Sequence, residues 1–256
     1  MQVLVLPWRY GQKKYGVEKG AVAMLDMLLY KNKNFNYKIL FPENDNNYDY
    51  HHKIYQEKSK IKSNCLVLGG DHSISIGSVM ESINNHKNVG VLWIDAHPDI
   101  NTIESSKTKN FHGMPLSFIT GLEKSWDWIN PMKKLSFDNL HYWGIRDIDE
   151  FENNIIERSN IINHLEAAKN MISNYDYIHL SLDIDGIDPK YTPSTGTPVS
   201  KGLELYDVNS IIEYLVNSNK DYTIDIVEYN PEIGSNYDKL KTNQNVNSII
   251  GSLTMI

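Results

Sequence analysis

Cysteine is almost missing from this chain, since Cys65 is the only one among 256 residues. One thiol cannot form a framework of disulfide bonds, so the class of small disulfide-stapled secreted proteins is excluded. Cys65 lies in an apolar run that continues to Leu68, and a lone cysteine of this kind indicates a reducing compartment.

Positive charge and long hydrophobic runs are also scarce. Lys and Arg number 25 against 32 Asp and Glu, which gives a formal net charge of −7 without any basic cluster. This balance argues against nucleic-acid binding. The apolar run from Val3 to Leu6 is too short for a signal peptide or a membrane span. We therefore expect a cytoplasmic protein that binds neither nucleic acid nor membranes.

The remaining composition is that of an ordinary globular protein, with 41% hydrophobic and 22% charged residues. Single α/β domains of about 200–250 residues are common, and a chain of this length buries roughly 70% of its unfolded surface. The asparagines around Asp45, which are Asn44, Asn46 and Asn47, suggest a loop insertion. We expect one domain over residues 1–256.

Short apolar runs rich in β-branched residues recur at wide intervals. They are Gln2 to Leu6, Cys65 to Leu68, Val89 to Ile94, His141 to Ile145, Tyr177 to Leu182 and Tyr222 to Val227. Helical spacing of apolar residues is found between them, in Val17 to Leu29, Ile74 to Ile83, Ile161 to Ile172 and Val208 to Val216. Apolar strands separated by helices indicate a parallel sheet buried on both faces. The sequence therefore predicts the α/β class, as a three-layer α/β/α sandwich with a mostly parallel central sheet.

Acidic and imidazole side chains follow four of these strands. Their positions are His72, the segment Asp95-Ala96-His97-Pro98-Asp99, the pair Asp183 and Asp185, and Glu228. The carboxyl ends of parallel strands share one edge of the sheet, where ligand crevices form. Four segments that are distant in the sequence are thus expected to converge on one site.

The spacing of these residues indicates a metal centre. Alternate residues of extended chain point to one side, so Asp95, His97 and Asp99 share a direction, as do Asp183 and Asp185. Four crowded aspartates repel one another, and two divalent cations would balance their charge. Oxygen ligands with a minority of imidazole suit Mn²⁺ better than a structural zinc site. Two such ions activate a bridging water and polarise a substrate.

Each piece also has a structural interpretation. An isolated Asp-x-His-x-Asp loop is more often solvated or capping, and His72 alone could be a buried structural histidine. We interpret Asp71 and Ser73 as caps of the following helix, and Asp188 before Pro189 as a turn residue. Only the combination at the strand ends favours a metal site formed by His72, Asp95, His97, Asp99, Asp183 and Asp185.

These segments resemble the signatures of the ureohydrolase family, which includes arginase, agmatinase and formiminoglutamase. The matching stretches are Gly69-Gly70-Asp71-His72-Ser73, Asp95-Ala96-His97-Pro98-Asp99, Ser181 to Pro189 and Glu228-Tyr229-Asn230-Pro231. The resemblance extends from Gly11 to about Ile250. It implies an arginase-like α/β/α sandwich that carries two Mn²⁺ ions per chain.

Within this family the chain most resembles arginase, through Gly16-Val17-Glu18-Lys19-Gly20, the loop from Asp99 to Pro115 and the segment Arg146 to Asp149. The resemblance implies hydrolysis of L-arginine to L-ornithine and urea by a metal-bridging hydroxide. The implied catalytic residues are His112, Glu228 and Asp99. The implied substrate contacts are Asn101 and Thr108 at the α-carboxylate, Asp149 at the α-ammonium and Glu228 at the guanidinium. It also leaves room for a homo-oligomer, either a trimer or a hexamer.

Two departures from the arginase pattern lie in one loop. Thr108 stands where a serine is usual, which keeps the hydroxyl, and Lys109 replaces a usual glycine. Because only glycine adopts positive φ freely, Lys109 bears on the path of this loop. Agmatine or a guanidino acid is the alternative substrate, since neither needs the contacts of Asn101, Thr108 and Asp149. A silent ureohydrolase-like binding protein is the alternative of another class.

Overall fold

The computed structural model describes residues 1–31 and 35–253. Among these residues, eight strands form one sheet in the order β2-β1-β3-β8-β7-β4-β5-β6, and every neighbouring pair is parallel. The strands are β1 (Gln2–Leu6), β2 (Asn36–Ile39), β3 (Cys65–Gly69), β4 (Val89–Ile94), β5 (Leu140–Trp143), β6 (Asn160–Ile162), β7 (Tyr177–Asp183) and β8 (Asp221–Val227).

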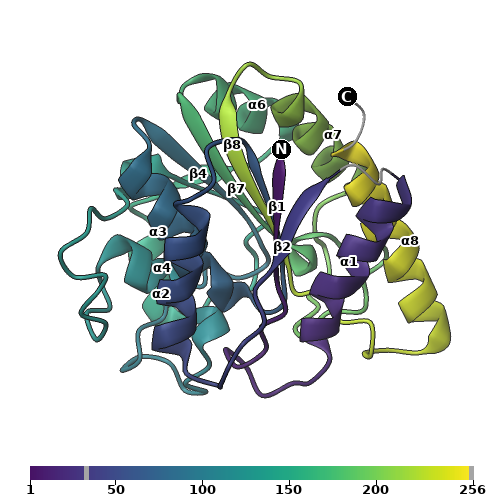
Figure 1. Cartoon of the computed structure of the whole chain (residues 1–256), viewed down its shortest axis with the longest axis horizontal. Coiled ribbons are helices and arrows are strands. Elements are labelled where there is room, and N and C mark those ends of the chain that lie inside the picture. The colour runs from purple at the N-terminus through teal and green to yellow at the C-terminus, as the bar shows by residue number, and fades with distance from the viewer. Residues whose placement is uncertain (32–34, 254–256) are drawn as a thin grey trace.

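Helices connect the strands and cover both faces of the sheet (Figure 1). They are α1 (Val17–Lys31), α2 (Asn47–Lys58), α3 (Ser75–Asn85), α4 (Pro115–Thr120), α5 (Glu150–Ile156), α6 (Leu165–Ser173), α7 (Leu205–Val216) and α8 (Asn236–Ser252). Helices α1, α8, α7 and α6 pack in a row on one face, while α2, α3 and α4 pack together on the other. This confirms the predicted α/β class and its three layers.

The central strands are apolar because both of their faces are covered. Every residue of β3, β4 and β7 is buried, so these strands read as nearly continuous hydrophobic runs. Each fully buried Val, Leu or Ile side chain contributes about 1.5–3 kcal/mol through removal of its surface from water. The centre of the sheet is therefore a rigid base for the loops at its edge.

The structure corrects two expectations about the elements. Ile161 was placed in a helix running to Ile172, but it lies in β6, and α6 begins only at Leu165 after the cap His164. The asparagines near Asp45 were interpreted as a loop insertion, yet Asn46 caps α2 by accepting a hydrogen bond from the Asp49 amide. Polar caps and short exposed strands explain both differences.

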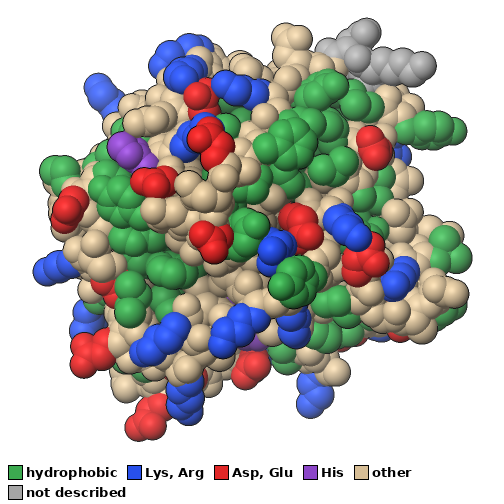
Figure 2. Space-filling model, turned by 60° about the horizontal axis from the view of Figure 1, so that its bottom comes forward, with side chains coloured by type: hydrophobic (Ala, Val, Ile, Leu, Met, Phe, Trp, Pro, Cys, Tyr) green, Lys and Arg blue, Asp and Glu red, His purple; other side chains and the backbone are tan. Residues whose placement is uncertain are grey.

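The topology puts the predicted site at the middle of the sheet. Strands β3, β8, β7 and β4 are consecutive neighbours, and their carboxyl ends carry His72, Glu228, Asp183 and Asp95. Basic, acidic and apolar side chains intersperse on the face that Figure 2 shows. In the described part of the chain, no helix combines the length and the apolar character that crossing a membrane requires.

Candidate active site and metal centre

The end of β3 is held in place by a close backbone contact. A Cβ atom on Gly70 would lie 1.8 Å from the Trp8 carbonyl oxygen, so only glycine fits where the chain leaves the strand. Asp71 then caps a short 3₁₀ turn by accepting hydrogen bonds from the Ser73 amide and from the Gly11 amide. The capping interpretation is confirmed for Asp71 but is wrong for Ser73, which lies inside the turn and donates to Asp71. The turn directs His72 over the sheet edge.

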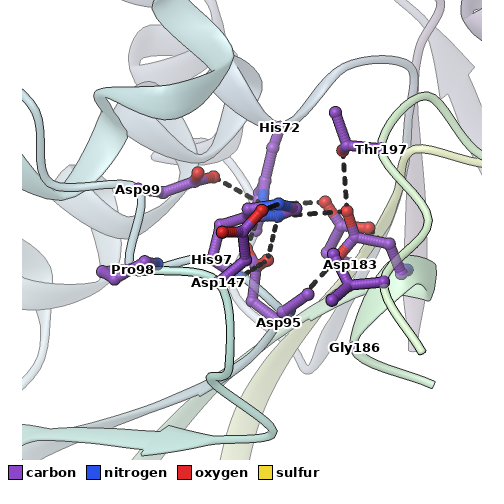
Figure 3. A network of polar contacts seen from close by, with 12 residues as sticks. His72, Asp95, His97, Pro98, Asp99, Asp147, Asp183, Gly186 and Thr197 are labelled. Atoms are coloured by element: carbon purple, nitrogen blue, oxygen red, sulfur yellow. Dashed lines mark hydrogen bonds and ion pairs between the residues drawn. The ribbon is translucent and has the colours of Figure 1, made fainter. Parts of the chain in front are cut away.

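Six side chains converge at this edge, and Figure 3 shows Asp95, Asp99 and Asp183 around His72 and His97. The Nδ1 atom of His72 lies 3.1 Å from Asp95 Oδ2, 3.1 Å from Asp99 Oδ2 and 3.4 Å from Asp183 Oδ2. On the other side, His97 Nδ1 lies 3.2 Å from Asp185 Oδ2 and 3.5 Å from Asp95 Oδ1. The structure thus brings together all of the residues that the sequence proposed as metal ligands.

These residues form two groups with the spacing of metal ligands. One comprises His72, Asp95 and Asp99, the other Asp95, His97 and Asp185, and in each group the ligand atoms lie within 4.8 Å of one another. Asp95 belongs to both groups and contributes a different oxygen to each imidazole. This is the arrangement expected of a carboxylate shared by two cations.

The polar groups of this cluster do not satisfy one another by hydrogen bonding and charge, and a bound cation would satisfy them. His72 Nδ1 is buried and makes no aligned hydrogen bond, although three carboxylate oxygens lie close to it. Burial, together with the neighbouring Asp95, raises the pKa of Asp99 to about 7. Burial and the charges of Asp185 and Asp95 raise the pKa of Asp183 well above its usual value. Divalent cations would relieve both the orphaned nitrogen and the crowded charges.

Residues that the sequence did not single out hold the cluster in place. The Trp93 indole donates a hydrogen bond of 3.0 Å to Asp95 Oδ2 and stacks on His72 with ring centroids 4.1 Å apart. The Thr197 hydroxyl donates to Asp185 Oδ2 at 2.9 Å. Trp93 and Asp95 are two positions apart, so the alternation along β4 could have indicated their contact. Nothing in the local sequence distinguishes Thr197.

Glu228 lies behind the cluster in a shell of donors. Its Oε1 atom accepts hydrogen bonds from the His72 amide at 2.9 Å and from Gln12 Nε2 at 3.0 Å, and it lies 3.2 Å from His112 Nδ1. Among the described residues, Oε2 accepts a hydrogen bond from Gln12 alone, at 2.8 Å. Glu228 therefore keeps one oxygen with free acceptor capacity, and Gln12 is a supporting residue that sequence reasoning missed.

The pKa of His112 lies above the usual value for a histidine side chain. Burial alone would lower the pKa of His112, but the Glu228 carboxylate, with Asp99 and Asp71, raises it to about 9. The ion pair with Glu228 thus lifts the pKa of His112 above the usual value for histidine. His112 is consequently an imidazolium at neutral pH, with a proton to donate.

A cavity of about 310 Å³ opens over the cluster, and three of the predicted substrate contacts, Asn101, Thr108 and Asp149, line it. Its lining includes five carboxylates, from Asp99, Asp147, Asp149, Glu152 and Asp183. Asn101 and Thr108 line the same cavity, and Asn101 Nδ2 donates a hydrogen bond of 2.8 Å to Asp149 Oδ2. Glu228 lies outside this lining, behind His112.

Lys109 adopts the backbone conformation that a glycine would allow at this position of the loop, and its side chain does not line the cavity. Its φ is +59°, so the lysine adopts the conformation that a glycine would allow. Its ammonium group donates to the carbonyl oxygens of Ile103, at 2.5 Å, and Glu104, at 3.1 Å. Lys109 therefore offers no cationic donor to a substrate in the cavity, because its ammonium group is bound within its own loop.

Comparisons with known proteins agree on one family. The Arginase family model matches residues 6–255. The chain is 34% identical to an arginase of Entamoeba histolytica over 98% of this chain and 96% of that protein. It is 40% identical to an arginase of Neurospora crassa over 68% of this chain, but that match spans only 55% of the Neurospora protein. The crystal structure of the Entamoeba histolytica arginase in complex with L-ornithine superposes with a TM-score of 0.88 at 33% identity, covering 100% of this chain and 97% of that one.

Proposed function

This chain belongs to the arginase family, and we infer that it is a metal-dependent hydrolase that converts L-arginine to L-ornithine and urea. One observation carries the inference: two His and Asp groups that share Asp95 lie at the base of a cavity rich in carboxylates. A guanidinium and an α-ammonium are both cations, so such a cavity suits arginine.

The metal centre of this proposal holds two Mn²⁺ ions per chain. His72, Asp95 and Asp99 hold one ion, Asp95, His97 and Asp185 hold the other, and Asp183 completes the cluster. The support is the orphaned Nδ1 of His72 and the mutual repulsion of the carboxylates described above. Divalent ions in such a site supply Lewis acidity, which lowers the pKa of water and provides hydroxide near neutral pH.

Glu228 orients the guanidinium in this scheme. Its buried carboxylate has acceptor capacity left on Oε2, and a charge-assisted hydrogen bond there would hold the guanidino carbon over the cluster. Gln12 and the His72 amide keep the carboxylate from turning away. Glu228 is thus proposed as a positioning contact for the reacting group.

His112 and Asp99 are proposed to transfer the proton that the leaving amine of arginine requires. Hydrolysis breaks the bond between the guanidino carbon and Nε of arginine, and Nε must leave with a proton. The His112 imidazolium lines the cavity and can give that proton to Nε, after which it recovers one from solvent. Asp99 lines the same cavity as His112, so its carboxylate can relay a proton between the attacking water and the leaving amine.

Asn101, Thr108 and Asp149 discriminate at the far end of the substrate. Asn101 and Thr108 offer an amide and a hydroxyl to the α-carboxylate, and the Asp149 carboxylate offers an anion to the α-ammonium. Lys107 also lines the cavity, but five carboxylates outnumber it, so a carboxylate-bearing substrate depends on these neutral donors. Agmatine would leave them without a partner, so arginine is proposed as the preferred substrate.

The same proposal includes a location and an assembly state: the enzyme is cytoplasmic and works as a homo-oligomer, either a trimer or a hexamer. The lone buried Cys65 supports a reducing compartment, and the family resemblance supports assembly. Light scattering of the purified protein measures its assembly state directly.

Metal dependence of urea release tests the proposed function. Protein stripped by a chelator is expected to release no urea from L-arginine, and reloading with Mn²⁺ is expected to restore release together with an equal amount of ornithine. Full activity after exhaustive chelation would overturn the proposal, because the attacking hydroxide would then not depend on a bound metal ion.

A further inference from the structure

A line of buried polar side chains leads away from His72, on the side opposite to the aspartate cluster. His72 Nε2 lies 2.9 Å from Ser181 Oγ, Ser181 Oγ lies 3.2 Å from Ser75 Oγ, and Ser75 donates to Asp225 Oδ2 at 3.1 Å. All four residues are fully buried, so no solvent exchanges with these groups. Ser181 lies on β7, Asp225 on β8 and Ser75 at the start of α3.

The line continues beyond Asp225 to a buried cation. His179 Nε2 lies 3.0 Å from Asp225 Oδ2, and His179 Nδ1 lies 2.8 Å from Ser82 Oγ. The Lys58 ammonium donates to Ser82 Oγ at 2.7 Å. Burial lowers the pKa of His179, so its ring is neutral, and the nitrogen that faces the Asp225 carboxylate, Nε2, carries the hydrogen. His179 therefore donates from Nε2 to Asp225, and its Nδ1 accepts from the Ser82 hydroxyl.

Asp225 is ionised, which makes it an acceptor only. Burial alone would raise the pKa of Asp225, but His179, Lys58 and a hydrogen bond from Ser78 hold it below its usual value. Hydrogen bonds from both directions therefore end on this carboxylate.

The hydrogens between Asp225 and His72 then have a single consistent order. Ser75 gives its only hydrogen to Asp225, so Ser181 must donate to Ser75. The Ser181 oxygen is left as an acceptor, so Nε2 of His72 must carry the hydrogen that it receives. Nδ1, the atom that faces Asp95, Asp99 and Asp183, is thereby left with its lone pair available for a metal ion.

We propose that Asp225 is a positioning residue for metal binding, which acts through Ser75 and Ser181 to keep the hydrogen of His72 on Nε2 and Nδ1 open to the cation. The inference rests on the proposed metal centre, since it assigns how one ligand of that centre is prepared. Asp225 itself touches neither substrate nor the metal ligands.

The two serines that donate to Asp225 provide a matched pair of variants. Ser75 and Ser78 are both fully buried on α3 and donate to different oxygens of Asp225, at 3.1 Å and 2.8 Å, but only Ser75 continues to His72. In Ser75→Ala, the hydroxyl of Ser181 is free to turn its hydrogen toward His72 Nε2, which favours the wrong tautomer. In Ser78→Ala, the order of hydrogens up to His72 is unchanged.

Titration of the chelator-stripped protein with Mn²⁺, followed by calorimetry, tests this difference. Ser75→Ala is expected to weaken binding by about 10-fold or more at one of the two sites, while Ser78→Ala keeps the wild-type affinity. Equal affinity of the two variants, whether both are weakened or neither is, would overturn the proposal. The thermal unfolding of both metal-free variants shows whether the fold is equally intact.

A second variant keeps the test decisive where Ser75→Ala does not fold. Ser181→Ala removes the acceptor of His72 Nε2 and is expected to weaken Mn²⁺ binding relative to Ser78→Ala in the same way. If the wild-type protein binds Mn²⁺ and releases urea but Ser75→Ala and Ser181→Ala bind Mn²⁺ as tightly as the wild type does, only the role proposed for Asp225 is overturned. Wild-type protein that binds no Mn²⁺ would overturn the metal centre as well.

Discussion

Three residues of the site have backbone conformations that side chains other than glycine rarely adopt. The φ angles of Asp99, Lys109 and Glu228 are +49°, +59° and +64°. Such conformations cost of order 1–2 kcal/mol each, so the surroundings must fix them. The Leu116 amide donates to the Asp99 carbonyl at 3.0 Å, and the Glu228 amide donates to the Gly70 carbonyl at 2.8 Å. At Asp99 and Glu228 the strain aims a carboxylate, and at Lys109 it sets the path of the loop beside the cavity; Asn88 and Lys201, outside the site, also have positive φ.

The individual residues of the site differ in how far the sequence could predict them. His72, Asp95 and Asp183 end strands that the sequence identified, so a parallel sheet had to bring them together. Gln12 and Thr197 come from loops of ordinary composition, and their contacts with Glu228 and Asp185 depend on tertiary structure alone. The line of hydrogen bonds from Asp225 through Ser75 to His72 could not be predicted from the sequence, because it depends on the packing of α3 on β7 and β8.

Asp95→Asn is expected to reduce Mn²⁺ binding from about two ions per chain to less than one, because Asp95 belongs to both ligand groups. Metal analysis after dialysis measures the loss. Asp188→Asn is the matched control, since the oxygens of Asp188 accept hydrogen bonds from the Lys190 and Gly202 amides and serve a turn. Equal metal loss in both variants would contradict the assignment of Asp95.

His112→Ala is expected to lower kcat for arginine by roughly 100-fold while leaving the metal content intact, because proton donation to the leaving amine is lost. Steady-state urea release and metal analysis of the same sample measure both effects. Partial rescue by added imidazole is the supporting result. Loss of metal in this variant would show instead that His112 maintains the centre.

At the scale of elements, burial decided which strands the sequence revealed. All six apolar runs are strands, because β1, β3, β4, β5, β7 and β8 lie inside the sheet. The two edge strands were missed: β2 exposes Asn36, Tyr37 and Lys38, and β6 exposes Ile161. A short apolar pair such as Ile161-Ile162 fits a helix or a strand equally well, so only pairing with β5 settles it.

The polar helices were missed for a related reason. Helix α8 has only a narrow buried stripe, with Val246, Ile249 and Ile250 facing α1 and α7. Its start at the capping box of Ser235 and Asp238 is nevertheless a signal that the sequence contains. Caps, more than apolar spacing, would have located α2 and α8.

A buried ion pair joins helices α2 and α3. Lys58 Nζ lies 2.5 Å from Glu81 Oε2, and the two side chains are 2% and 4% exposed. Lys58→Met is expected to lower the free energy of unfolding by about 3–5 kcal/mol, because an unpaired carboxylate then remains buried. The double variant Lys58→Met/Glu81→Leu should recover most of this loss.

Urea denaturation measures these changes in the free energy of unfolding. Lys60→Ala is the control, since it breaks an exposed pair with Glu57 that contributes at most about 1 kcal/mol. A loss for Lys58→Met no larger than that for Lys60→Ala would contradict the account of the buried pair.

At the scale of the whole molecule, the proposed metal centre would link the middle strands of the sheet. Its ligands follow β3, β4 and β7, and Glu228 follows β8. Metal ions that neutralise the crowded carboxylates bind the folded chain in preference to the unfolded one. Removal of Mn²⁺ is therefore expected to lower the unfolding temperature by several degrees, measured by calorimetry with and without a chelator. An unchanged unfolding temperature would contradict a metal-stabilised core.

The preference for arginine over agmatine tests the central claim most directly. The two substrates differ by the α-carboxylate that Asn101 and Thr108 are proposed to bind, so kcat/KM of the Mn²⁺-loaded enzyme should favour arginine by about 100-fold or more. Asp149→Asn should narrow this ratio by damaging arginine turnover, while asparagine still caps α5 as Asp149 does. Equal kcat/KM for the two substrates, with no effect of Asp149→Asn, would contradict arginine as the substrate.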